Sequence, residues 1–257
     1  MKNSQDKKPK SSIKPGQIWQ LGDHRLACGD SRDKELIRRL IGKDKVHLIC
    51  CDVPYGVAVV ESKREFSALA KDKIIANDQL QTDDEYRRFN YEWLVAIAPH
   101  LASHNALYIF NADRMVWALR DGLVDAGFKI AQLLVWVKSQ SVVGRLDYAP
   151  QHELIVYGWR GVHRFHRSKD KSALFYPRPA RSPLHPSTKP VGLIRRLVLN
   201  STQIGGAVYD GFLGSGTTLL ACEQTGRKCF AVEIDVEYCR TAIRQWEKLT
   251  GLKAKLL

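Results

Sequence analysis

Short apolar runs alternate with helix-like spacings along most of this chain. Val46 to Cys51 form an apolar run that stops at Asp52, which is typical of a strand buried on both faces of a parallel sheet. Residues 33–42 instead repeat their apolar positions every three or four residues, which predicts a helix with one buried face. Thr82 and Glu85 have the spacing of a capping box and mark the start of another helix.

The same patterns predict an ordered set of elements, beginning with a hairpin in residues 15–30. We expect strands at 46–51, 105–110, 130–138, 153–159, 206–210 and 228–234. We expect helices at 33–42, 82–101, 115–126, 190–201, 217–226 and 236–250. Residues 57–80, 160–189 and 211–216 are expected to be loops. Strands that alternate with helices indicate an α/β fold with a largely parallel sheet.

The charge of the chain indicates the kind of partner it binds. Its 257 residues carry a formal net charge of +13, and nucleic acid is the commonest acidic partner of such a protein. A solubilising surface is the alternative explanation. Residues 1–14 are rich in lysine and are predicted to be a disordered basic tail. No apolar run approaches the roughly 18–20 residues that cross a bilayer, so we expect no membrane association and a cytoplasmic location.

The six cysteines show no zinc-type C-x-x-C pairs, so we expect reduced, mostly buried thiols and no metal site. Cys50 and Cys51 are adjacent in a predicted strand and should point to opposite faces of the sheet.

A glycine-rich turn at residues 211–216 joins a predicted strand to a predicted helix and indicates a ligand site. Its glycines let the backbone approach a ligand closely, and Asp210 precedes them. Glu233 ends the next strand and suits the hydroxyls of a ribose. We therefore expect a nucleotide-like ligand, with a plain tight turn as the alternative. The third glycine of the dinucleotide pattern G-x-G-x-x-G is missing.

A second candidate site follows the strand at 46–51. Asp52, Pro54 and Tyr55 leave the carboxyl end of that strand, which is where open α/β sheets bind ligands. Aspartate and proline also open ordinary loops, so this segment does not decide between a site and a loop by itself.

In their order along the chain, these segments resemble the beta group of amino DNA methyltransferases. The Asp-Pro-Pro-Tyr motif of that group is similar to residues 52–55, and its Asp-Pro-Phe-x-Gly-Ser-Gly-Thr signature to residues 210–217. Its His-Pro-Thr-x-Lys-Pro block is similar to residues 185–190, and its opening segment to residues 19–30.

The resemblance implies a Rossmann-like S-adenosylmethionine-dependent methyltransferase fold. Its sheet would be mostly parallel, with helices on both faces, and permuted so that the catalytic motif precedes the cofactor motif. Residues 15–257 would form this one domain. The residues that the resemblance places near S-adenosylmethionine are Asp30, Asp52, Thr188, Lys189, Pro190, Asp210, Phe212, Gly214, Ser215, Gly216, Thr217 and Glu233.

The resemblance also implies roles for the tetrapeptide. The Asp52 carboxylate and the Val53 carbonyl would accept the two hydrogens of an exocyclic base amine, which makes its nitrogen more nucleophilic. Tyr55 would stack on the flipped base, and Pro54 would stiffen the turn. In this family, aspartate rather than serine at the first position favours adenine N6, and cytosine N4 is the alternative.

Two positions depart from the family pattern, because Val53 and Gly211 stand where the family has proline. Any residue at position 53 supplies the carbonyl, whereas Gly211 is expected to loosen its loop by about 0.5–1 kcal/mol. A weakened or inactive DNA-binding descendant is therefore a second hypothesis. A nicotinamide oxidoreductase is a third, and the incomplete glycine pattern argues against it.

Basic and aromatic residues mix in residues 138–185, which we predict to be the segment that recognises double-stranded DNA. A solvated loop is the alternative. The candidate contacts are Lys138, Gln140, Arg145, His152, Arg160, Arg164 and Arg167. A homodimer and a separate restriction endonuclease stay open as partners, in a prokaryote or encoded by a phage.

Overall fold

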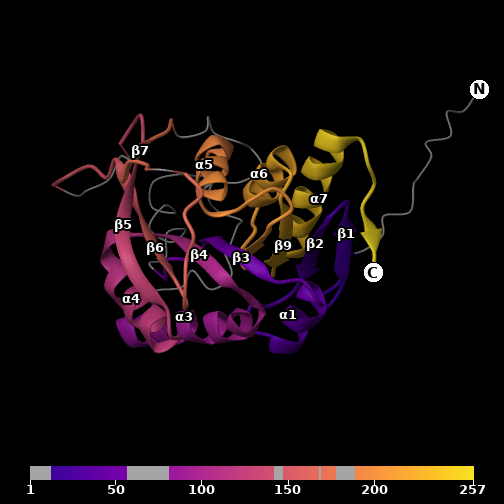
Figure 1. The fold of residues 1–257 in the computed structure, drawn as a ribbon, viewed down its shortest axis with the longest axis horizontal. Coiled ribbons are helices and arrows are strands. Elements are labelled where there is room, and N and C mark those ends of the chain that lie inside the picture. Colours follow the sequence, from indigo (N-terminus) through magenta and orange to yellow (C-terminus); the bar gives the residue numbers. More distant parts are fainter. Residues whose placement is uncertain (1–12, 57–80, 142–146, 168, 178–188) are drawn as a thin grey trace, which may run out of the picture.

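A mixed sheet forms the centre of the part of the chain that the structure describes. The computed structural model describes residues 13–56, 81–141, 147–167, 169–177 and 189–257 (Figure 1). Its strands are β1 (Ile18–Leu21), β2 (His24–Cys28), β3 (Val46–Asp52), β4 (Leu101–Asn111), β5 (Lys129–Val137), β6 (His152–Trp159), β7 (Ala173–Phe175), β8 (Ala207–Asp210), β9 (Lys228–Glu233) and β10 (Lys255–Leu256).

The strand order is β10-β1-β2-β9-β8-β3-β4-β6-β5-β7. From β2 to β4 all neighbours run parallel, so the centre of the sheet is parallel. Towards one rim, β1 pairs antiparallel with β2 and β10. Towards the other, β6 is antiparallel to both β4 and β5, and β7 is parallel to β5.

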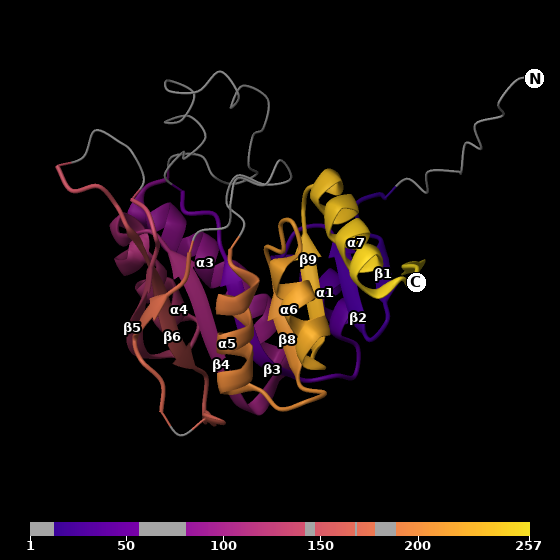
Figure 2. The ribbon, with the colours of Figure 1, turned by 90° about the horizontal axis from the view of Figure 1, so that it is seen from above.

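Helices cover both faces of this sheet (Figure 1). The helices are α1 (Lys34–Ile41), α3 (Asp83–Ile97), α4 (Val116–Asp125), α5 (Val191–Ser201), α6 (Thr217–Thr225) and α7 (Val236–Thr250), with short 3-10 turns at Ala98–His100 and Asp113–Met115. Helices α1, α3 and α4 bury their apolar sides in one core cluster, and α5, α6 and α7 in a second cluster. Figure 2 shows α5, α6 and α7 side by side on one face. The expected α/β fold with a mostly parallel sheet and helices on both faces is confirmed.

The alternating side chains of β3 explain the two cores. Cys51 belongs to the cluster of α1, α3 and α4, and Cys50 to the cluster of α5, α6 and α7. The prediction that these neighbours point to opposite faces is therefore confirmed. All six cysteines are free and buried, as expected.

Several predicted boundaries differ from the observed ones. The helix predicted at 82–101 starts at its capping box but ends at Ile97, because Pro99 cannot continue it and a 3-10 turn follows. Strand β4 then begins at Leu101, earlier than the predicted residue 105. The short strands β7 and β10 were not predicted, because two or three residues carry too little periodicity.

Several predictions lie wholly or partly outside the described residues: the basic tail, apart from its last two residues, the loop at 57–80, and parts of the segments 138–185 and 185–190. Within the described residues, no helix is long and apolar enough to cross a membrane.

Candidate active site

The two halves of the candidate site meet at one edge of the sheet. Strand β3 lies beside β8, with Ile49 opposite Tyr209. Because the two strands are parallel, Asp52 at the end of β3 and Asp210 at the end of β8 come to the same edge. Asp52 is half-buried and Asp210 is buried. We call this side of the sheet the catalytic edge.

Five polar side chains at the catalytic edge form one interaction network, which we call the Asp52 network. The Lys189 Nζ lies 2.5 Å from Asp52 Oδ2 and 3.2 Å from Glu153 Oε2. The Lys138 Nζ lies 2.7 Å from Glu153 Oε1. The Tyr55 hydroxyl lies 3.0 Å from both Asp52 Oδ1 and Glu153 Oε2. The network therefore holds two carboxylates, two lysines and one phenol.

Burial and charge act in opposite directions on these groups. Burial raises the pKa of Asp52, and the nearby Lys189 ammonium offsets only part of that rise. Burial alone would lower the pKa of Lys189, but the carboxylates of Asp52 and Glu153 outweigh it and raise that pKa. Burial also opposes ionisation of Glu153, yet its two lysines lower its pKa to about 2. Glu153 is thus ionised at neutral pH, and it lies beside Asp52, a carboxylate with a higher pKa.

Glu153 is a site residue that the sequence analysis missed. It is the second residue of β6, opposite Trp136 of β5, and reaches Tyr55 from 98 positions away in the chain. The available signal was a glutamate near the start of an otherwise apolar run, which is unusual for a buried strand.

Lys138 corrects one expectation about DNA contacts. Only 7% of its side chain is exposed, and its ammonium pairs with Glu153 and lies 5.3 Å from the centre of the Trp136 ring. A lysine held in this way is not available to a phosphate on the surface.

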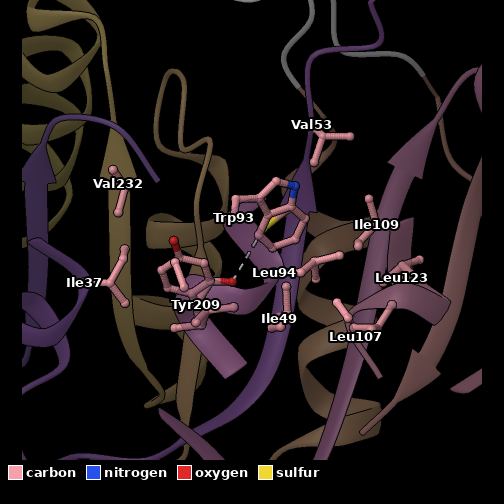
Figure 3. Close-up of a cluster of buried hydrophobic side chains, with 14 of the residues drawn as sticks. Ile37, Ile49, Val53, Trp93, Leu94, Leu107, Ile109, Leu123, Tyr209 and Val232 are labelled. Carbon is pink, nitrogen blue, oxygen red and sulfur yellow. Dashed lines mark hydrogen bonds between the residues drawn. The ribbon is translucent and has the colours of Figure 1, made fainter. Parts of the chain in front are cut away.

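The valine of the tetrapeptide has a packing role. Val53 is 2% exposed and belongs to the core cluster that also holds Trp93 of α3 (Figure 3). Pro54 and Tyr55 are half-buried, and Gly56 takes a φ of 64°, which favours glycine. The side chain of Val53 thereby anchors the start of the loop that carries Tyr55.

The glycine-rich turn is held against Glu233 of β9. The N–H of Gly214 donates to Glu233 Oε2 at 2.7 Å, and the N–H of Asp235 donates to Oε1 at 2.8 Å. Burial raises the pKa of Glu233 to about 7 and that of Asp210 to about 6. Gly216 has a φ of 101°, and an added Cβ would lie 3.1 Å from the Ala242 Cβ. Turn, acid and helix α7 are therefore closely packed.

Other residues expected near the cofactor lie around this turn. Ser215 is buried, Thr217 begins α6, and Pro190 caps α5 beside Lys189. Phe212 is half-buried, and its ring lies 5.5 Å from that of Trp93. Thr188 lies outside the described residues.

Asp30 follows β2 close to the turn, because a Cβ added at Gly211 would lie 3.3 Å from the Cβ of the adjacent Ser31. Asp30 also lines a hollow together with Lys34 of α1 and with Tyr91 and Glu92 of α3. Its carboxylate pairs with Arg32 at 2.7 Å. The Arg32 guanidinium carbon also lies 5.7 Å from the centre of the Phe89 ring.

The residues expected to contact DNA do not share one surface. Gln140 and His152 are exposed at the catalytic edge, where β5 ends and β6 begins. Arg160, Arg164 and Arg167 follow the end of β6, which runs antiparallel to β4, so they lie at the opposite edge of the sheet. The antiparallel strand β6 thus places the two parts of the predicted DNA-recognition segment, residues 138–185, at opposite edges of the sheet. Arg145 lies outside the described residues.

The sequence of this chain is similar to those of known proteins. The profile of the N6/N4 methylase family, described as DNA methylase, matches residues 46–244. A relative is the Type II methyltransferase M.HpaI of Haemophilus parainfluenzae, which is 25% identical over 86% of this chain and 73% of its own length.

Two solved structures have a similar fold. The M1.HpyAVI–SAM complex gives a TM-score of 0.63 at 23% identity, over 86% of this chain and 98% of that one. The PvuII DNA methyltransferase, described as cytosine-N4-specific, gives a TM-score of 0.67 at 16% identity, over 88% and 89% of the two chains.

Proposed function

The chain belongs to the N6/N4 family of DNA methylases, and on that premise we propose that it transfers a methyl group from S-adenosylmethionine to the N6 amine of adenine in double-stranded DNA. The observation that carries this proposal is the adjacency of Asp52 and the glycine-rich turn. The strand that ends in Asp52 pairs directly with the strand that leads into that turn. A carboxylate for the target amine and a binding site for a nucleoside therefore lie together at the catalytic edge.

The groups around the turn fit an adenosine-containing cofactor. The Glu233 carboxylate is buried and oriented by two backbone N–H groups, and each of its oxygens keeps a lone pair for a ribose hydroxyl. Within the described residues, no side chain caps the start of α6, so its first N–H groups can serve a polar ligand. We propose that Glu233, Asp210, Phe212 and the turn hold S-adenosylmethionine. When bound, it supplies a methyl carbon made electrophilic by its sulfonium.

The residues of the Asp52 network prepare the amine for attack. The Asp52 carboxylate accepts one amine hydrogen, and the Val53 carbonyl accepts the other, which localises the nitrogen lone pair. Tyr55 offers its ring to the flipped base. Lys189 keeps Asp52 in place through its 2.5 Å contact with Oδ2. The other carboxylate oxygen, Oδ1, faces the Tyr55 hydroxyl. Preorganised acceptors of this kind lower the barrier because they need no reorganisation during the reaction.

Aspartate at the first position of the motif supports adenine as the target. Cytosine N4 is the alternative product within the same family, and a DNA-binding descendant without turnover is the alternative of another class. A separate restriction endonuclease stays a prediction.

Transfer of a labelled methyl group from S-adenosylmethionine to duplex DNA, followed by nucleoside analysis, tests the proposal. N6-methyl-2′-deoxyadenosine as the labelled product is the expected result. N4-methylcytosine would refute the adenine assignment, and DNA binding with no labelled base would favour the inactive descendant.

A further inference from the structure

We propose that Glu153 is a positioning residue for methyl transfer, which holds Lys189 beside Asp52, offers the Tyr55 hydroxyl a second acceptor, and keeps Asp52 a strong acceptor, while Lys138 limits this effect. The inference rests on the proposed function, because it assigns Asp52 to the target amine. Glu153 itself is expected to touch neither the base nor the cofactor.

The position of Glu153 fits an indirect role. Strand β4 separates β6 from β3, so Glu153 reaches the Asp52 network across one intervening strand. Its Oε2 contacts Lys189 at 3.2 Å and Tyr55 at 3.0 Å, and its Oε1 contacts Lys138 at 2.7 Å. Its Oε2 is thus committed to two groups that contact Asp52, and its Oε1 to Lys138.

The charges of the network balance only if Glu153 is present. Two ammonium groups, each on a side chain that is 7% exposed, face the two carboxylates. Removal of the Glu153 charge would leave Lys138 and Lys189 with Asp52 as the remaining carboxylate of the network. Lys189 would then keep Asp52 as its carboxylate partner, beside its 3.4 Å contact with the Tyr55 hydroxyl. Lys138 would lose the carboxylate it pairs with, and a buried charge without a partner is costly.

The Tyr55 hydroxyl has one proton and two acceptors at equal distance. While it donates to Asp52 Oδ1, that oxygen is partly engaged; when it donates to Glu153 Oε2, Asp52 Oδ1 is free for the amine. Because of Glu153, the Tyr55 hydroxyl can give up its hydrogen bond to Asp52 and still donate a hydrogen bond to a carboxylate.

Glu153 also acts on Asp52 through its charge. In the described residues, the titratable groups that face Asp52 are Tyr55 after β3, Cys50 within β3, Asp210 of β8, Glu153 of β6 and Lys189 before α5, with Lys138 behind Glu153. The negative charge of Glu153 raises the pKa of Asp52, and Lys189 lowers it. A carboxylate with a higher pKa accepts a hydrogen bond more strongly, which favours a more nucleophilic amine.

Two substitutions with opposite expected effects test the inference. Glu153→Gln removes the like charge, so the acidic limb of the kcat–pH profile should move to lower pH, by about half a unit or more. Its kcat should fall about 10- to 100-fold, while the KM for S-adenosylmethionine changes less than about 3-fold. Lys138→Met leaves Glu153 less neutralised, so the same limb should move to higher pH. Asp121→Asn, on the exposed side of α4, is the matched control and should leave the profile unchanged.

A ¹³C-carboxyl titration of Asp52 in the protein without cofactor gives a second readout. The apparent pKa of Asp52 should be lower in Glu153→Gln and higher in Lys138→Met than in the wild type. A wild-type kcat and profile in Glu153→Gln, or shifts in the same direction in both variants, would overturn the inference. If Glu153→Gln does not fold, Lys138→Met decides: an upward shift supports the inference and an unshifted Asp52 overturns it.

The two proposals fail in different ways. If the wild type transfers no methyl group to any DNA, the proposed function fails, while the carboxyl titration still decides whether Glu153 and Lys138 tune Asp52. If the wild type is active and neither variant changes the titration, the inference alone fails.

Discussion

Asp52 is half-buried and has a lysine ammonium 2.5 Å from one of its carboxylate oxygens. Burial raises its pKa, and Lys189 keeps the carboxylate in place without removing that rise. At the scale of single residues, the reactivity of this site therefore depends on the balance between desolvation and one close charge.

Asp52→Ala is expected to abolish methyl transfer and to preserve cofactor binding, because it removes the acceptor and leaves the glycine-rich turn intact. We expect a loss of at least about 100-fold in kcat. Labelled-methyl transfer and calorimetric titration with S-adenosylmethionine measure the two effects. An unchanged rate in Asp52→Ala would contradict the assigned role.

Gly211→Pro restores the family residue and should nevertheless destabilise this chain. The Gly211 N–H donates to Cys51 Sγ at 3.3 Å, and a Cβ at this position would lie 3.0 Å from the Tyr209 hydroxyl. We expect a loss of about 1–3 kcal/mol in the free energy of unfolding, measured with urea. The loss should shrink in a Tyr209→Phe background, which removes the hydroxyl; a stabilising Gly211→Pro would show that the loop is loose instead.

Glu233 should make the stability of the cofactor-free protein pH-dependent. Its folded pKa of about 7 lies above the ordinary value, so the folded state binds more protons between about pH 4.5 and 7. This contribution to stability is complete below about pH 4.5 and is lost as the pH rises through 7. The fall in Tm across this window should be shallower in Glu233→Gln than in the wild type. Equal slopes in the two proteins would contradict the raised pKa.

At the scale of elements, the junction between β8 and α6 is the most constrained turn of the site. Gly216 starts α6 in a left-handed conformation, and an added Cβ would lie only 3.1 Å from the Ala242 Cβ of α7, which is closer than an ordinary contact. The position of the cofactor turn is thus set by the packing of α7 as well as by the turn itself.

Gly216→Ala should therefore cost more than an alanine at another left-handed glycine. Gly251 ends α7 with a φ of 74°, and a Cβ added there would meet no atom within 4 Å, so Gly251→Ala isolates backbone strain. We expect about 1 kcal/mol for Gly251→Ala and about 1–3 kcal/mol more for Gly216→Ala, measured with urea. Gly216→Ala should also weaken cofactor binding. Equal costs would show that Ala242 moves aside freely.

At the scale of the whole molecule, the direction of β6 decides which basic residues can meet DNA near Asp52. It places His152 at the catalytic edge and Arg160 at the opposite one. A duplex whose flipped base reaches Asp52 must lie over the catalytic edge.

The double variant Gln140→Ala, His152→Ala is expected to weaken DNA binding about 10-fold or more at moderate salt. The matched variant Arg164→Ala, Arg167→Ala removes two charges from the opposite edge and should change the Kd less than about 3-fold. Fluorescence anisotropy with a labelled duplex measures both. A larger effect of the arginine pair would place DNA on the other edge of the sheet.

The sequence by itself determined the longer helices and strands, the α/β class and the family, because apolar periodicity, capping and motif spacing act over a few neighbouring residues. It also identified Asp52, Asp210, Glu233 and the glycine-rich turn as candidate site groups. Only the tertiary structure decided that Glu153 and Lys138 join Asp52, and that Arg160 lies away from it. The physical reason is that these contacts depend on the order of the strands in the sheet and on the antiparallel direction of β6, which the pattern of neighbouring residues did not reveal.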